Sequence, residues 1–276
     1  MRRTERLSPS LLRVRLGAPP GPVPAGCAPV GGFASGGRDQ SLSLFLPHPG
    51  QREPVVPAEA GEGWFAAWRE LPEDVRAVMR SYTLRGRRVT PEGGTEIDID
   101  FALHGDGGPA SRWAASAVAG DRVLVLGPAI RDNSAVRFRP PAEADSLVLW
   151  ADETALPAAA AILEALPPGL PADVWIEVGD EAGRIPLTTA ADARVTWLPR
   201  TTPGTPDSLA ALRAHRLRGT APYAWIAGES GTVRALRRHL VRERGLDRRS
   251  VTFTGYWKRG MSEEQLRASA VRQETD

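Results

Sequence analysis

The sequence predicts two domains, an N-terminal antiparallel β-barrel and a C-terminal α/β domain with a doubly wound parallel sheet. Its 276 residues exceed the usual length of one domain. Up to about residue 140, short β-rich segments are separated by Gly and Pro, whereas later segments alternate between apolar strands and helices. We therefore expect domains at 1–140 and 141–276, joined by a proline-containing linker at 137–145.

The composition is typical of a globular protein and excludes several other classes. The apolar fraction is 42% and the charged fraction 25%, enough to form a core. No apolar run approaches the ~20 residues needed to cross a bilayer, and the basic first residues lack the apolar core of a secretory signal. The single Cys27 excludes an internal disulfide and a cysteine-cluster metal site. These features indicate the cytoplasm, and a net charge of +2 is too small to indicate nucleic-acid binding.

The barrel is predicted from short segments of β character in the first half of the chain. We expect strands at 11–17, 41–47, 81–89, 95–103 and 121–127. The segment 95–103 is the clearest, because Ile97, Ile99 and Phe101 alternate with acidic residues in the two-residue period of a strand. Helical pieces are expected at 64–71, 73–80 and 111–117. Five or six strands at these spacings are typical of a small antiparallel barrel.

The second half of the chain predicts a parallel sheet covered on both faces. Strands are expected at 146–152, 173–180, 193–199, 223–229 and 251–257, and helices at 157–166, 208–215, 232–245 and 262–271. Such a sheet binds its ligand at the carboxyl ends of its strands. The barrel then contributes a second ligand or the other wall of the site, which favours an enzyme with two cofactors over a single binding module.

A charged aromatic segment in the barrel is the first candidate site. On a strand, Arg80 and Tyr82 share one face and Thr83 lies on the other. A fixed cation, a flat ring and a hydroxyl suit an isoalloxazine ring and its ribityl or pyrophosphate chain. An ordinary surface strand would explain the same spacing.

A glycine-rich turn at 104–114 is the second candidate site. Its glycines allow backbone amides to approach a phosphate, and the helix beginning near Ser111 presents a positive N-terminus. A glycine-rich turn alone is more often a simple loop. In the second half, residues 152–158 join a strand to a helix; Thr154 can cap that helix and Pro157 suits its first turn, roles that need no ligand.

Together these motifs carry a resemblance to a known family. The R-x-Y-T pattern at 80–83 is similar to the flavin-binding motif of the ferredoxin reductase-like superfamily. With HGDGGPASRWA at 104–114, DETALPA at 152–158, AGE at 227–229 and GYWKRG at 255–260, the chain resembles the siderophore-interacting protein family. Those proteins are FAD-dependent, NAD(P)H-driven ferric-siderophore reductases. The resemblance covers nearly the whole chain and implies a ferredoxin-NADP reductase-like fold.

The resemblance implies that the barrel binds FAD and the α/β domain binds NAD(P)H. The cofactor-binding residues that it implies are Arg80, Tyr82, Thr83, His104, Gly107, Gly108, Pro109, Ala110, Asp152, Glu153, Thr154, Ala155, Glu229 and Trp257. The protein needs no general acid or base of its own, because electrons pass through FAD. NADH is favoured over NADPH because Asp180 and Glu181 would repel a 2′-phosphate, although Arg184 and Arg200 argue the other way.

The expected substrate is a ferric siderophore, whose iron arrives already chelated because no His and carboxylate cluster has metal-ligand spacing. Family members usually carry a lysine in the second strand, where this chain has Ser43. Lys258, the only lysine, and Arg259 are therefore the candidate substrate-binding residues. A monomer is favoured, with no nucleic-acid partner. The alternatives are a flavin reductase that serves another electron acceptor and a non-enzymatic siderophore-binding protein.

Overall fold

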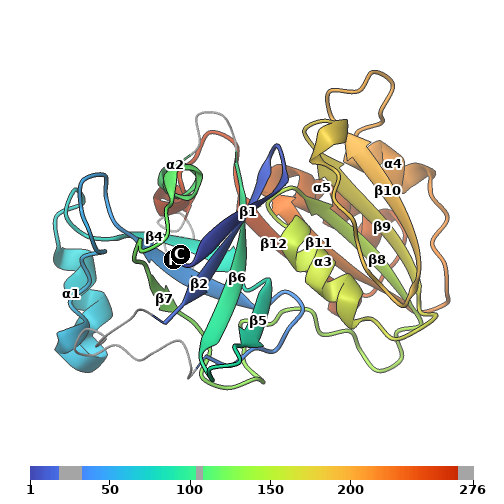
Figure 1. Ribbon diagram of the computed structural model, residues 1–276. Coiled ribbons are helices and arrows are strands. Elements are labelled where there is room, and N and C mark those ends of the chain that lie inside the picture. The colour runs from blue at the N-terminus through green and yellow to red at the C-terminus, as the bar shows by residue number, and fades with distance from the viewer. Residues whose placement is uncertain (19–32, 104–107, 267–276) are drawn as a thin grey trace. The chain divides into compact units, whose positions relative to one another are not determined.

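The chain forms two compact units, Met1–Val136 and Arg137–Asp276 (Figure 1). The computed structural model describes residues 1–18, 33–103 and 108–266. The predicted division after residue 140 lies close to the boundary between the units. Within the described ranges, no helix is both long and apolar enough to cross a membrane.

The N-terminal unit consists of antiparallel strands in two sheets, with the orders β1-β2-β6-β5 and β4-β3-β7. The strands are β1 (Arg3–Ser8), β2 (Leu11–Gly17), β3 (Ser41–Leu46), β4 (Val78–Thr83), β5 (Gly86–Val89), β6 (Thr95–Ala102) and β7 (Leu124–Leu126). The helices are η2 (Ala58–Gly63), α1 (Trp64–Glu70) and α2 (Pro109–Ser116). This arrangement confirms the predicted antiparallel β fold of the N-terminal domain.

One core lies between the two sheets because their strands alternate as predicted. In β6, Ile97, Ile99 and Phe101 are fully buried and pack with the inward leucines of β2 and β3. Ala110 and Ala114 of α2 pack against the same cluster. The N-terminus of α2 is thereby fixed beside the barrel core, which matters for the site described below.

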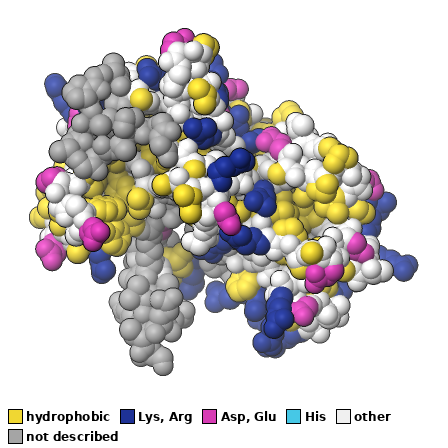
Figure 2. Space-filling model, turned by 90° about the horizontal axis from the view of Figure 1, so that it is seen from below, with side chains coloured by type: hydrophobic (Ala, Val, Ile, Leu, Met, Phe, Trp, Pro, Cys, Tyr) yellow, Lys and Arg dark blue, Asp and Glu magenta, His cyan; other side chains and the backbone are white. Residues whose placement is uncertain are grey.

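A second apolar cluster joins α1 to β3. Phe45 of β3 makes edge-on ring contacts with Trp64 and Trp68, and Phe65 stacks on Trp68 with a centroid distance of 5.4 Å. The Trp68 indole also donates a hydrogen bond of 3.1 Å to the carbonyl of Ala77. Phe65 remains 39% exposed, and hydrophobic side chains are visible at the left of Figure 2, the side on which Figure 1 shows α1.

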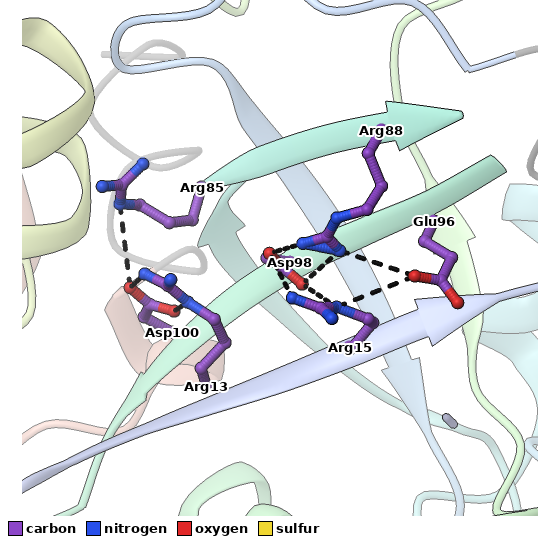
Figure 3. A network of polar contacts seen from close by, with 7 residues as sticks. All are labelled: Arg13, Arg15, Arg85, Arg88, Glu96, Asp98 and Asp100. Carbon is purple, nitrogen blue, oxygen red and sulfur yellow. Dashed lines mark hydrogen bonds and ion pairs between the residues drawn. The ribbon is translucent and has the colours of Figure 1, made fainter. Parts of the chain in front are cut away.

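The outer face of the β1-β2-β6-β5 sheet carries an ionic ladder, defined here as Arg13, Arg15, Arg85, Arg88, Glu96, Asp98 and Asp100 (Figure 3). Arg13 donates two hydrogen bonds to Asp100, at 2.7 and 2.8 Å. Arg15 donates two to Asp98, at 2.9 and 3.3 Å, and Arg88 donates to both oxygens of the same carboxylate. The Asp98 and Asp100 side chains are only 7% and 1% exposed. Arginine stems that cover these carboxylates explain how they are buried on an outer face.

Two secondary-structure predictions in this unit are wrong. The helix predicted at 73–80 is a turn at Pro72 followed by β4, because Val78 and its successors pair with β3 in a ladder that runs from Leu46 to Ser41. Strand pairing overrides the local helical period there. The strand predicted at 81–89 is divided between β4 and β5, which belong to different sheets. Strand β1 was not predicted, since most of its residues are exposed and polar.

The C-terminal unit contains a five-stranded parallel sheet with the order β10-β9-β8-β11-β12. Its strands are β8 (Ser146–Asp152), β9 (Pro171–Val178), β10 (Asp192–Pro199), β11 (Pro222–Glu229) and β12 (Val251–Trp257). Its helices are α3 (Leu156–Ala165), η3 (Glu181–Gly183), α4 (Ser208–Ala214), α5 (Ser230–Arg238), η4 (His239–Glu243) and η5 (Arg248–Ser250). Helix α3 covers one face and α4 and α5 the other (Figure 1), which confirms the doubly wound prediction.

The order in which strands are added to the sheet reverses at β8. From β8 the chain moves outward through β9 to β10 on one side, then returns to β11 and β12 on the other. The carboxyl ends of β8 and β11, which are hydrogen-bonded neighbours, therefore form the topological switch point where doubly wound sheets bind ligands. The predicted helix at 232–245 is α5 followed by a π-helical turn, η4. The last predicted helix, 262–271, lies partly outside the described residues.

We expect the substitution D98N to destabilise the N-terminal unit by about 2–4 kcal/mol, because it leaves Arg15 and Arg88 facing each other without their shared, largely buried carboxylate. The midpoint of urea denaturation measures the effect. E73Q is the matched control, since Glu73 also pairs with an arginine but its side chain is 88% exposed, and it should cost less than about 0.5 kcal/mol. Equal midpoints for the two variants would show that the ladder adds no stability.

Candidate functional site

The predicted flavin-binding strand is β4, and two of its three candidate residues lie on one face of the strand. These are Arg80 and Tyr82, and β4 contacts α2. The Arg80 guanidinium donates a 2.8 Å hydrogen bond to the carbonyl of Met79. The Tyr82 ring packs against Phe101 with a centroid distance of 4.4 Å, and Phe101 packs in turn against Trp113 of α2. Thr83 is buried on the opposite face of the strand. The structure therefore places Arg80 and Tyr82 on one face of β4 and Thr83 on the other.

The N-terminus of α2 has the features of an anion site. Gly108 is the N-cap residue and makes no side-chain cap bond, Pro109 follows in the first turn, and that turn contains no acidic residue. The Ser111 hydroxyl donates a 2.9 Å hydrogen bond to the carbonyl of Ala102, which ties the helix to the end of β6. The backbone N–H groups of a helix N-terminus, together with the helix dipole, favour a negative group here.

A cavity of about 730 Å³ adjoins this helix. Its walls include Val78 of β4, Pro109, Arg112 and Trp113 of α2, and the loop residues His48 and Arg122. Its volume is within the range of cofactor pockets. The sequence analysis missed both as site residues: His48 lies in a loop without a motif, and Arg122 lies in the segment 121–127, which was expected only as a strand. His104 and Gly107, two predicted flavin contacts, lie outside the described residues.

In the C-terminal unit, the buried Asp152 carboxylate connects three strand ends. One oxygen accepts hydrogen bonds from the Thr154 amide and hydroxyl, at 2.9 and 2.6 Å, and from the Ala155 amide at 3.2 Å. The other accepts from the Glu229 amide at 2.8 Å and from the Trp257 indole at 2.7 Å. Burial raises the pKa of Asp152 above its ordinary value, while these donors act in the opposite direction. The predicted residues Asp152, Thr154, Ala155, Glu229 and Trp257 are thus brought together at the switch point.

Two glycines allow this close approach of strand ends. Gly228 has φ +146°, and a Cβ there would lie 2.5 Å from the Asp152 carboxylate. At Gly255, a Cβ would lie 2.4 Å from the Ser230 hydroxyl, which donates a 2.8 Å hydrogen bond to the carbonyl of Trp257. The A-G-E and G-Y-W motifs therefore have a steric basis in addition to any contact with a ligand.

Glu229 caps α5 at the same edge of the sheet. One of its carboxylate oxygens accepts from the amides of Gly231 and Thr232, at 2.6 and 2.9 Å, and the other from the Arg259 amide at 3.4 Å. Partial burial alone would raise the pKa of Glu229, but the donors from Thr232, Arg259 and Gly231 outweigh it and lower the pKa. Lys258 and Arg259, the predicted substrate contacts, follow Trp257 directly, and the Arg259 amide connects this segment to Glu229.

Glu153 lies apart from this group and belongs to a charged cluster at the ends of β8, β9 and β10. Its carboxylate is 3.6 Å from the Arg200 guanidinium, which lies 3.3 Å from Glu177 on its other side. Glu177 accepts a hydrogen bond of 2.5 Å from the Ser208 hydroxyl. The sequence analysis considered Arg200 only as an isolated cation and missed Glu177 and Ser208, because nothing in their local sequence connects them.

One local prediction is wrong. Thr154 does not cap α3; its hydroxyl donates to Asp152, and the N-cap residue is Ala155, without a side-chain bond. Asp152, the last residue of β8, satisfies the backbone before this helix instead, because its carboxylate accepts hydrogen bonds from the amides of Thr154 and Ala155. Pro157 lies in the first turn as predicted. Among the described residues, no group of three or more His, Cys, Asp or Glu side chains could hold a metal ion.

Comparison with known families identifies both halves of the chain. A family model described as the siderophore-interacting FAD-binding domain matches residues 1–132, and one described as siderophore-interacting protein matches residues 144–260. The ferric vibriobactin reductase ViuB of Vibrio cholerae is 30% identical over 237 residues, which cover 84% of this chain and 82% of ViuB. The NADPH-dependent ferric-chelate reductase of Escherichia coli is 30% identical over 261 residues, which cover 92% and 90% of the two chains.

Solved structures agree with these matches. The siderophore-interacting protein SipS from Aeromonas hydrophila superposes with a TM-score of 0.75 and 28% identity, over 100% of this chain and 96% of SipS. A siderophore utilization protein from T. fusca superposes with a TM-score of 0.65 and 32% identity, over 95% and 92% of the two chains. The ferredoxin reductase of carbazole 1,9a-dioxygenase, at 17% identity and a TM-score of 0.57, shares the fold.

We expect G228A to destabilise the C-terminal unit by about 2–5 kcal/mol, because the added Cβ would be strained at φ +146° and would clash with a carboxylate fixed by five hydrogen bonds. G169A is the matched control. Gly169 also has a positive φ, +74°, but a Cβ there meets nothing within 4 Å, so only backbone strain of about 1 kcal/mol is expected. Guanidinium denaturation of both variants measures the difference, and a G228A protein no less stable than G169A would contradict the steric argument.

Proposed function

We propose that this chain, which belongs to the siderophore-interacting protein family, is an FAD-containing ferric-siderophore reductase driven by a reduced nicotinamide dinucleotide. The family models and the named reductases at 30% identity support this proposal. The observation that supports it most is that one chain contains two candidate sites. In the N-terminal unit, the N-terminus of α2 lies near the strand that carries Tyr82. In the C-terminal unit, hydrogen bonds to Asp152 fix the switch point of a parallel sheet.

The N-terminal unit has residues that fit FAD. Arg80 and the N-terminus of α2 would hold the pyrophosphate, and Tyr82, backed by Phe101, would offer its ring to the isoalloxazine. The 730 Å³ cavity beside α2, with Arg112 and Arg122 in its walls, has room for the adenosine end of the cofactor. Bound FAD would supply the conversion of a two-electron hydride donor into single electrons for iron.

The C-terminal unit has residues that fit a dinucleotide. Doubly wound sheets bind such ligands across the carboxyl ends of their strands at the switch point, where Asp152 fixes the turns after β8 and β11. Trp257, held by its indole N–H, would provide a flat wall for the nicotinamide ring. The charged ends of β9 and β10 would then face the adenosine half.

The substrate in this proposal is an iron chelate. Ferric siderophores present hard oxygen ligands, and Fe(II) binds such ligands more weakly than Fe(III), so one-electron reduction promotes release of the metal. Each hydride would reduce two ferric ions. Lys258 and Arg259 would attract the chelate where it is anionic.

The function is tested with the purified protein. We expect a yellow protein whose flavin is bleached by NADH or NADPH under anaerobic conditions and reoxidised by a ferric chelate, with Fe(II) captured by a ferrous-specific dye. Reoxidation by free flavin or by a protein acceptor, without any by ferric chelates, would favour a reductase with another acceptor. A colourless protein that binds chelates would favour a siderophore-binding protein.

Flavin binding is tested with R80A. Removal of a charged hydrogen-bond donor typically costs about 1.5–3 kcal/mol, so FAD affinity should fall about 10- to 150-fold. Fluorescence titration of the apoprotein with FAD measures this affinity. R87A, which removes an exposed arginine of the nearby strand β5, should bind FAD as the wild type does. Unchanged FAD affinity in R80A would remove Arg80 from the flavin site.

Chelate attraction is tested with K258A. We expect slower reoxidation of the reduced flavin by an anionic ferric chelate, because a cation near the site raises the encounter rate. The loss should shrink at high salt, where charges are screened, and flavin reduction by NADH should stay the same. Stopped-flow absorbance measures both half reactions. Wild-type rates in both at low salt would show that Lys258 plays no part and would direct attention to Arg259.

A further inference from the structure

The arginine at the end of β10 is the cation that a nucleotide would meet on the β9–β10 side of the switch point. The Arg200 side chain is 42% exposed, so a ligand could reach it. Its two terminal nitrogens nevertheless point to different carboxylates, one 3.6 Å from Glu153 and the other 3.3 Å from Glu177. One positive charge is therefore shared between two negative ones.

The two carboxylates are fixed in place, so this arrangement is built into the sheet. The Glu153 side chain is 7% exposed and the Glu177 side chain 19%. Glu177 is anchored by the Ser208 hydroxyl, which itself accepts a 2.8 Å hydrogen bond from the buried Trp150 indole. The Arg200 amide donates to the carbonyl of Val178, which extends the β9–β10 pairing past the end of the strand.

In the neighbouring turn an arginine is also paired with a carboxylate. Arg184, the second cation that the sequence analysis considered for the 2′-phosphate, lies 2.7 Å from Glu181. Asp180 adds a further carboxylate at the N-cap of η3, where it accepts from the Gly183 amide. The ends of β8, β9 and β10 therefore combine two paired arginines, Arg184 and Arg200, with four carboxylates, so the local charge is negative. The carboxylates are Glu153, Glu177, Asp180 and Glu181.

We infer that this cluster selects NADH over NADPH, with Arg200 as a counter-ion to Glu153 and Glu177 and not as a phosphate receptor. In doubly wound sheets, a carboxylate at the end of the second strand accepts a hydrogen bond from the ribose 2′-hydroxyl of NAD, whereas an accessible arginine receives the 2′-phosphate of NADP. Glu177 lies at that position in β9. A 2′-phosphate would have to displace a carboxylate from Arg200 and would be repelled by both.

The inference rests on the proposed function, because it assumes a dinucleotide along this edge. It separates this chain from the E. coli relative, whose name states NADPH dependence. It also reverses the role that Arg200 had in the sequence analysis, where an isolated arginine argued for NADPH.

The test uses binding, so that it does not depend on bound flavin or on turnover. Isothermal titration calorimetry of the full chain compares 5′-AMP, the adenosine half of NADH, with 2′,5′-ADP, which differs from 5′-AMP by the 2′-phosphate alone. We expect wild-type protein to bind 5′-AMP at least about tenfold more tightly at low salt, and we expect the ratio to narrow as salt screens the repulsion.

Substitutions assign the effect to individual residues. E153Q/E177Q keeps the shapes of both side chains and releases the Arg200 charge, so 2′,5′-ADP should gain about 10- to 100-fold relative to 5′-AMP. The triple variant E153Q/E177Q/R200M should lose that gain. E181Q is the matched control, because it releases the charge of Arg184 instead. Stopped-flow reduction by NADH and NADPH should follow the same order.

The possible failures are distinguishable. If neither 5′-AMP nor 2′,5′-ADP binds, the proposed nucleotide site is wrong. Tighter binding of 2′,5′-ADP to the wild-type protein would overturn the inference and leave the proposed function intact. A gain in E181Q without one in E153Q/E177Q would also overturn it, by assigning the selectivity to Arg184.

Discussion

The geometry of the C-terminal unit depends on a single buried carboxylate. Asp152 accepts five hydrogen bonds that come from the turn before α3, from the end of β11 and from the end of β12. A carboxylate is expensive to bury, and burial raises its pKa, so each of these donors has to be in place. The three strand ends are consequently fixed to one point. This also fixes the positions of Glu229 and Trp257, the last residues of β11 and β12.

The planar guanidinium group of arginine binds carboxylates in both units, but in different arrangements. On the barrel, Arg13 and Arg15 each bind an aspartate with two hydrogen bonds, and their stems cover carboxylates that would otherwise face water. At the ends of β9 and β10, Arg200 has one nitrogen toward each of two glutamates. In both units these guanidinium groups hold carboxylates in place, so Arg13, Arg15 and Arg200 cannot be counted as available positive charge.

The sequence predicted the elements whose signal is local and periodic. The alternation in β6, the apolar strands of the parallel sheet and the first turn of α3 at Pro157 all follow from spacing that a single segment contains. The helix expected at 73–80 was wrong because pairing with β3 decided the conformation. The motifs located Asp152, Glu229 and Trp257, but their contact with one another depends on the strand order. Glu177, Ser208 and His48 carry no local signal at all.

The fit of Gly228 against Asp152, and of Gly255 against Ser230, has a consequence for how relatives of this chain can diverge. Neither glycine can acquire a side chain while its partner keeps its own, since a Cβ would lie 2.5 and 2.4 Å from the partner's atoms. At Gly255 a smaller residue at position 230 would remove the clash, whereas at Gly228 the positive φ would strain any side chain even with a smaller residue at position 152, which would also release the indole of Trp257. We therefore expect substitutions at positions 230 and 255 to occur together across the family, and glycine to be retained at position 228.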